Sequence, residues 1–267
     1  MLQLSARNLI PAAATVLLVL AARSARAEGW WVGTRVPNAV GESSFDGEIS
    51  ARAAWAPGLV PAFRSGARDR FCGGIDAEAW MSGRVRLGLS WEWLVDDTVA
   101  SPPVSGPGDV RLGTAARLFQ GGDWTAGLGW EAKLPNAANE TELGTDETDI
   151  LFGAWGRWGH GPWSAAGALG LGVLGNPLRF ANQDDVPMIR AEAGWAQKRI
   201  GARALLVADL ATPRNPARVS AGGALRYGEG WFVEVEGAGG LTAAAADGHV
   251  MLRLGVTGAL PRRDSGE

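Results

Sequence analysis

Residues 84–95 read RVRLGLSWEWLV, and this stretch decides the fold. Apolar side chains occupy every second position from Val85 to Val95, and the positions between them are mostly small or charged. A period of two is typical of a β-strand with one apolar face. The same alternation recurs along the chain and predicts further strands. The expected ranges are 49–55, 72–81, 84–95, 110–118, 124–134, 150–158, 163–173, 188–196, 200–210, 218–227, 231–239 and 250–257.

The gaps between these segments are alternately short and long. Strands that cross an outer membrane turn tightly on the periplasmic side and are joined by longer loops outside. The sequence therefore predicts an all-β protein: a transmembrane antiparallel up-and-down β-barrel of about 12 strands, formed by residues 45–260. The short gaps are 82–83, 120–123, 159–162, 197–199 and 228–230, and the long ones are 57–70, 96–108, 135–147, 175–187, 211–217 and 241–249.

A soluble periplasmic β-protein would also alternate, but with its apolar face inward. The N-terminal residues favour export, because Arg7 precedes a mostly apolar stretch and Ala25-Arg26-Ala27 is a small-x-small cleavage site. We expect residues 1–27 to be a cleaved signal peptide. Residues 28–44 would form either a periplasmic tether or a hatch inside the lumen, and residues 261–267 a polar tail.

Tryptophan supports a membrane location. All 13 tryptophans follow residue 27, and many lie near the ends of predicted strands. Because indoles favour the bilayer interface, we expect them to form a girdle. No stretch after residue 27 approaches the ~18 consecutive apolar residues of a spanning helix, so a closed barrel is the membrane structure that fits. The expected girdle residues are Trp55, Trp80, Trp91, Trp93, Trp124, Trp155, Trp158, Trp163 and Trp231.

Charge and cysteine content exclude several functions. Loss of the signal peptide removes three arginines and no acidic residue, so the net charge moves from −3 to −6, which disfavours nucleic-acid binding. Cys72 is the only cysteine, so no intramolecular disulfide or cysteine metal cluster is expected. The carboxylate-rich loop 139–149 could bind calcium, but it lacks the spacing of a dedicated calcium loop. We expect a solvated loop, no metal and no cofactor.

The inner face of the predicted strands carries charges of both signs in similar numbers. Pairing between strands is therefore expected rather than a strongly ion-selective pore. The sequence leaves open whether these residues only fill a wet interior or also contact a solute. The residues predicted to line the lumen are Arg84, Arg86, Glu92, Arg111, Arg117, Glu131, Lys133, Arg157, Arg190, Glu192, Glu234 and Arg253.

The sequence gives little indication of catalysis. His160 lies in a predicted periplasmic turn, and His249 lies at the extracellular end of a predicted strand. Neither histidine shares an evident site with a serine and an acid. We therefore predict no catalytic residues and no enzyme activity.

Two motifs, the second of which has two parts, resemble a known family. Residues 106–112 read GPGDVRL and open a strand; residues 133–135 read KLP and end the next one; LGTD at 143–146 precedes another. Together they resemble the outer-membrane transporters of the phenol meta-degradation pathway. Glycine and proline end strands, and aspartate can cap exposed backbone N–H groups at a loop edge. The loop-edge motif residues are Gly106, Gly108, Asp109, Pro135, Gly144 and Asp146.

The resemblance implies a barrel that passes small organic, often aromatic, compounds. We therefore expect an outer-membrane channel or facilitator for small, apolar or aromatic solutes. Its expected partners are outer-membrane lipid, the solute and the barrel assembly machinery. A structural or surface-exposed barrel without transport is the alternative, and a barrel lipase-type enzyme is a third hypothesis.

Overall fold

The computed structural model describes residues 43–59, 68–81, 83–97, 104–136, 148–174, 184–212, 216–242, 245 and 248–261. The predicted signal peptide, residues 28–42 of the tether or hatch, and residues 262–267 of the tail lie outside this part of the chain. So does most of the carboxylate-rich loop, including Gly144 and Asp146.

The described chain forms twelve long strands and one short strand. No helix long and apolar enough to cross a membrane occurs among the described residues. The short strand is β4 (Val104–Gly106). The long strands are β1 (Ser43–Leu59), β2 (Arg68–Met81), β3 (Val85–Asp97), β5 (Val110–Gly121), β6 (Trp124–Leu134), β7 (Asp149–His160), β8 (Trp163–Leu174), β9 (Asp184–Gln197), β10 (Ile200–Asp209), β11 (Arg218–Tyr227), β12 (Trp231–Gly240) and β13 (His249–Pro261).

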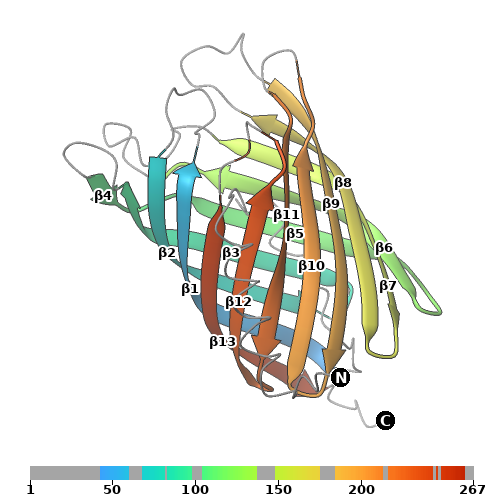
Figure 1. Cartoon of the computed structure of the whole chain (residues 1–267). Coiled ribbons are helices and arrows are strands. Elements are labelled where there is room, and N and C mark those ends of the chain that lie inside the picture. Colours follow the sequence, from blue (N-terminus) through green and yellow to red (C-terminus); the bar gives the residue numbers. More distant parts are fainter. Residues whose placement is uncertain are drawn as a thin grey trace, which may run out of the picture.

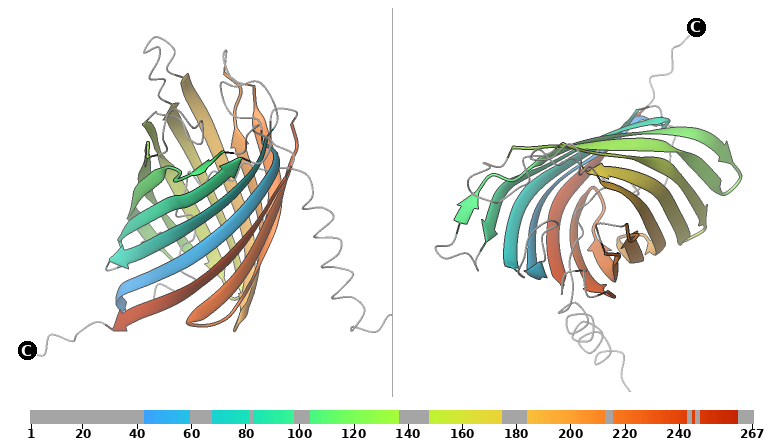
Figure 2. Two further views of the ribbon diagram at one scale, coloured as in Figure 1. Left: turned by 90° about the vertical axis from the view of Figure 1, so that its left-hand side faces the viewer. Right: turned by 90° about the horizontal axis from the view of Figure 1, so that it is seen from above.

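The strands close into a ring. Their neighbour order is β2-β1-β13-β12-β11-β10-β9-β8-β7-β6-β5-β3, and β2 also pairs with β3. All pairings are antiparallel, and the first and last strands, β1 and β13, lie side by side (Figures 1 and 2). The strands tilt strongly relative to the barrel axis (Figure 2). This confirms the predicted all-β closed barrel of twelve antiparallel strands.

Short turns lie at one end of the barrel, here called the turn end, together with the start of β1 and the end of β13 (Figure 1). The opposite end is called the loop end. Three of the turns have two residues, and the first residue of each has a positive φ: Gly122 at 54°, Gly161 at 56° and Lys198 at 51°. A glycine adopts this conformation without steric cost, whereas a lysine does not.

The two faces of the sheet have opposite character. On β3, Leu87 and Leu89 point outward and are 47% and 41% exposed, whereas Arg86 between them and the turn is only 2% exposed. An apolar outer face and a charged inner face are the reverse of a soluble β-protein. Exposed aromatic side chains gather towards both ends; these are Trp55, Phe71, Trp91 and Trp93 towards the loop end, and Phe119, Trp124, Trp163, Tyr227 and Trp231 towards the turn end, with Trp130 and Phe152 between them. Trp158 and Trp195, also towards the turn end, are half-buried.

The girdle prediction is wrong for two tryptophans. Trp80 and Trp155 are 3% and 8% exposed and point into the barrel. Trp80 shares its face of β2 with Asp76 and Glu78, because alternate residues of a strand lie on the same side. The strand register therefore decides the direction of these side chains, and their closeness to a strand end does not.

Several strands extend beyond their predicted bounds: β2 begins at Arg68 rather than at residue 72, β9 begins at Asp184 rather than at residue 188, and β13 ends only at Pro261. The alternation predicted a first strand from residue 49, whereas β1 begins at Ser43. The loop predicted at 96–108 contains β4, which pairs with the end of β3. Three residues are too few to produce a visible period of two.

Candidate functional site

The candidate site is the inner wall of the barrel, and its centre is a chain of ion pairs. Arg253 on β13 reaches over β1 to Asp76 on β2, with Nη2 2.7 Å from Oδ2. Arg52 on β1 contacts the other oxygen of Asp76, with Nε 3.3 Å from Oδ1, and places Nη2 3.5 Å from Glu92 on β3. The first three strands and the last strand are thus joined by side chains as well as by backbone.

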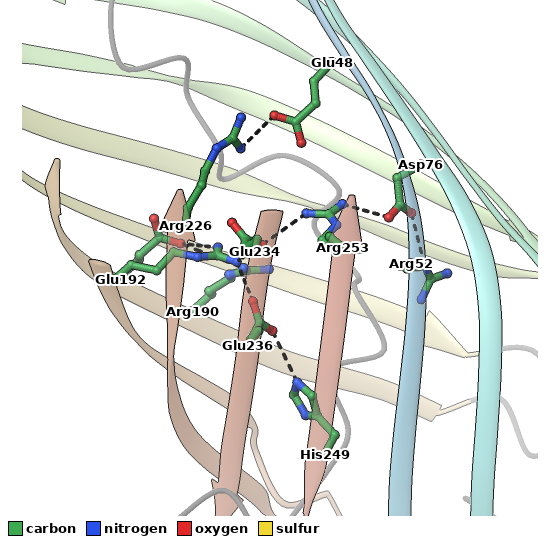
Figure 3. Close-up of polar contacts among 11 residues, drawn as sticks. Glu48, Arg52, Asp76, Arg190, Glu192, Arg226, Glu234, Glu236, His249 and Arg253 are labelled. Atoms are coloured by element: carbon green, nitrogen blue, oxygen red, sulfur yellow. Dashed lines mark hydrogen bonds and ion pairs between the residues drawn. The ribbon is translucent and has the colours of Figure 1, made fainter. Parts of the chain in front are cut away.

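The same chain of contacts continues around the barrel through Arg203 on β10. Arg203 contacts Glu234 and Glu236 on β12 and lies 3.3 Å from Glu192 on β9. Glu234 also lies 3.6 Å from Nη1 of Arg253, which connects the two groups. Figure 3 shows these side chains converging inside the barrel. We call this set the interior charge network: Glu92, Arg52, Asp76, Arg253, Glu234, Arg203, Glu236, Glu192 and Arg190, whose Nη2 is 4.0 Å from Glu192.

Two contacts lie beside this network. Nε2 of His249 is 3.3 Å from Oε1 of Glu236, and both side chains are 6% exposed. Arg226 donates from Nη1 to Oε2 of Glu48 at 2.9 Å, and its guanidinium lies 3.6 Å from the centre of the Phe232 ring. The first contact joins the consecutive strands β12 and β13, and the second joins β11 to β1, which is distant from it in the sequence (Figure 3).

The wall formed by β5, β6 and β7 carries a separate group of charges. Arg111 and Glu131 face each other across β5 and β6, with Nη1 3.3 Å from Oε1. Lys133 lies between two carboxylates, with Nζ 2.7 Å from Asp149 and 3.8 Å from Asp109. Arg111 and Lys133 are therefore each matched by a nearby carboxylate.

Part of the predicted loop-edge motif meets at the loop end of these strands. Oδ1 of Asp109 accepts the backbone N–H of Asn136 at 3.3 Å, and the Asn136 side chain donates to the Gly108 carbonyl. The Gly108 N–H donates to the Glu92 carbonyl at 2.6 Å, which extends the pairing between β3 and the residues before β5. Gly106 ends β4, and Pro135 is exposed beyond the end of β6.

Four further predicted residues lie towards the turn end. Arg86 is paired with Glu78, with Nε 2.7 Å from Oε1. Arg84 occupies the turn before β3 and is exposed, so it stands at the rim rather than on the wall. Nη1 of Arg117 is buried without a hydrogen-bond partner among the described residues. Arg157, half-buried on β7, interacts electrostatically with Glu192.

An apolar cluster occupies another part of the interior. Trp80 from β2 and Trp155 from β7 meet edge to face, with ring centres 6.3 Å apart and planes at 77°. Aliphatic side chains from three other strands and β7 itself surround them. The buried members of the cluster are Trp80, Ala115, Leu151, Trp155, Ala168, Val186 and Met188.

A groove of about 950 Å³ lies on the outer face and not in the lumen. Outward residues such as Ile49, Leu87 and Trp130 line it, and each is about half exposed. This groove belongs to the apolar outer surface, so it is not part of the inner wall that forms the candidate site.

Sequence reasoning missed several interior residues. Glu48 lies just before the expected start of the first strand, and an earlier start would have placed it on the face of Arg52. His249 was assigned to a strand end, and its contact with Glu236 depends on the pairing of β12 with β13. Asp149 belongs to the predicted carboxylate-rich loop and follows the family motif, but its contact with Lys133 at the start of β7 was not predicted.

Each histidine contacts one carboxylate. Nδ1 of the exposed His160 is 2.9 Å from Asp123 in the adjacent turn, and His249 contacts Glu236 inside the barrel. Among the described residues, no group of three or more His, Cys, Asp or Glu side chains is arranged to hold a metal ion. The described interior thus presents paired charges and buried aromatic rings.

Comparison with known proteins places the fold. No family model matches the sequence, and no curated protein matches it. Among solved structures, an outer-membrane channel from Pseudomonas putida F1 aligns with a TM-score of 0.61 at 12% identity, covering 82% of this chain and 97% of that one. The KdgM porin aligns with a TM-score of 0.51 at 10% identity, covering 79% and 97%. The chain is thus a closed antiparallel β-barrel that resembles outer-membrane channel proteins in fold.

Proposed function

We propose that this protein is an outer-membrane channel for small, apolar or aromatic organic solutes. The observation that carries the proposal is the buried apolar cluster around Trp80 and Trp155 inside a barrel whose remaining wall is charged. A passage for polar solutes does not require two inward indoles, whereas an apolar solute binds favourably against them. The outer face, with exposed leucines between two aromatic girdles, supports a location in the bilayer.

The charges of the inner wall support a channel with little preference between anions and cations. Along the interior charge network each arginine lies beside at least one carboxylate, so neither sign of charge dominates the wall. A strongly selective pore would instead present a ring of one sign.

The resemblance to the phenol meta-pathway transporters supports an aromatic solute. Its motif residues Asp109 and Lys133 lie 3.8 Å apart, and their contacts are with the loop edge rather than with the apolar cluster. We therefore assign these residues to the construction of the rim. The aromatic side chains of the cluster are the residues that we expect to contact the solute.

A barrel without transport is the second candidate. The contact of Trp80 with Trp155 favours this candidate, because the contact narrows the interior.

Transport is tested with purified protein in liposomes and two permanently charged aromatic solutes, phenyltrimethylammonium and benzenesulfonate. Neither crosses a lipid bilayer readily without a channel. We expect both to enter, at rates within about threefold of each other, because the paired wall charges leave little net field.

Deletion of residues 28–42 forms a second arm of this experiment. If these residues are a hatch, conductance should rise when they are removed, and if they are a tether it should not change. Heat-modifiability on gels reports whether each barrel is folded. Folded protein that admits neither solute, with or without residues 28–42, would contradict the channel and support the structural candidate.

A further inference from the structure

Trp80 and Trp155 come from strands that are not neighbours. β3, β5 and β6 lie between β2 and β7 in the barrel. At a spacing of about 4.8 Å between strands, the two attachment points are about 19 Å apart along the wall. Their ring centres are nevertheless only 6.3 Å apart. The two side chains therefore reach towards each other over the intervening strands and close part of the interior.

Small residues on the intervening strands make this contact geometrically feasible. A Cβ atom added to Gly127 on β6 would lie 2.8 Å from the Trp155 ring. Ala115 on β5 is buried in the same cluster. Larger side chains at these inner positions would occupy the space in which the two indoles meet.

Both indoles are also held by hydrogen bonds. Nε1 of Trp155 donates to the Leu128 carbonyl at 3.3 Å, and Nε1 of Trp80 donates to Glu78 at 3.2 Å. Glu78 is fixed in turn by its ion pair with Arg86. The ring faces and edges, rather than the N–H groups, are therefore the parts of these side chains that are available to an apolar molecule.

We propose that Trp80 and Trp155 form an aromatic constriction that selects solutes by their ring, an inference that rests on the proposed channel function. A solute that passes this point separates the two indoles and loses their edge-to-face contact. An aromatic solute replaces that contact with its own ring, whereas a saturated ring of the same size does not. The selected substrate class is thus planar aromatic compounds over alicyclic compounds of equal size and charge.

The test compares uptake of phenylalanine and 3-cyclohexylalanine into liposomes. These zwitterions cross bilayers slowly without a channel, and they differ only in the ring. We expect the wild-type protein to admit phenylalanine about threefold to tenfold faster, the range that one aromatic pair contributes. Trp155→Leu should bring the ratio close to one, mainly through faster entry of 3-cyclohexylalanine, and Trp155→Phe should keep the preference.

Trp130→Leu is the matched control, because Trp130 points outward on β6 and is 48% exposed. Its ratio should equal that of the wild type. Trp80→Leu provides an independent variant if Trp155→Leu fails to fold, as judged by heat-modifiability. A wild-type ratio near one, or an unchanged ratio in a folded Trp155→Leu or Trp80→Leu protein, would overturn the constriction but leave the channel intact. Absence of uptake of either solute by the folded wild type would overturn both.

Discussion

Arg253 on the last strand and Asp76 on the second strand form an ion pair of 2.7 Å that passes over β1. Asp76 is also 3.3 Å from Arg52, so one buried carboxylate holds two guanidinium groups at the seam between the two ends of the sheet. The seam therefore depends on this carboxylate as well as on the backbone ladders on both sides of β1.

Replacement of Asp76 by alanine should destabilise the barrel strongly. The change leaves Arg52 and Arg253 without this carboxylate in an interior where both are nearly buried. Breaking a buried pair in this way costs about 3–5 kcal/mol. Chemical unfolding in detergent measures the loss. Glu229→Ala is the control, because its pair with Arg199 is exposed and should contribute less than about 1 kcal/mol. Equal losses for both variants would contradict the role of Asp76.

An arginine on the outer face should be costly in proportion to its depth in the bilayer. Leu128 lies near the middle of β6 and is 53% exposed, whereas Ile200 begins β10 at the turn end. Leu128→Arg should cost about 2–4 kcal/mol, and Ile200→Arg no more than about 1 kcal/mol. Unfolding in lipid vesicles compares the two variants. A neutral Leu128→Arg would mean that this face does not contact lipid.

Removing the glycine from one two-residue turn should lower the stability of the barrel, whereas introducing a glycine into another should raise it slightly. Gly161→Ala places a side chain at a φ of 56° and should destabilise by about 1–2 kcal/mol, although nothing lies within 4 Å of the added Cβ. Lys198→Gly relieves the same conformation but makes the unfolded chain more flexible, so we expect a gain of less than about 1 kcal/mol. Denaturant midpoints measure both changes. A destabilised Lys198→Gly protein would show that its side chain makes contacts that outweigh the backbone cost.

Asp109 should matter to the loop edge and not to the passage of solute. Asp109→Asn keeps an acceptor for the Asn136 N–H, so it should reduce stability less than Asp109→Ala, which removes a cap of about 1 kcal/mol. Flux of phenyltrimethylammonium and benzenesulfonate should stay within about twofold of the wild type in both variants. A collapse of flux in a folded Asp109→Asn barrel would instead place this carboxylate in the passage.

On β3, periodicity was sufficient to predict which side chains share a face. The alternation in residues 84–95 separated Arg86 from Leu87 and Leu89 correctly, because a one-residue shift of register would reverse every side chain. Periodicity did not predict which inward side chains contact each other. Arg253 contacts Asp76 over an intervening strand, and Trp80 meets Trp155 over three. Such contacts depend on curvature and tilt, which a period of two does not encode.

The pairing of Ser43 with Pro261 brings the two ends of the barrel backbone together. A short peptide joining these residues would make the strands a continuous circle. New termini could then be opened at another turn, such as the one between His160 and Trp163. The closing pair would change from β1 and β13 to β7 and β8, with the same ladders in the finished barrel. A circular permutant of this kind should reach the same fold by a different order of strand pairing.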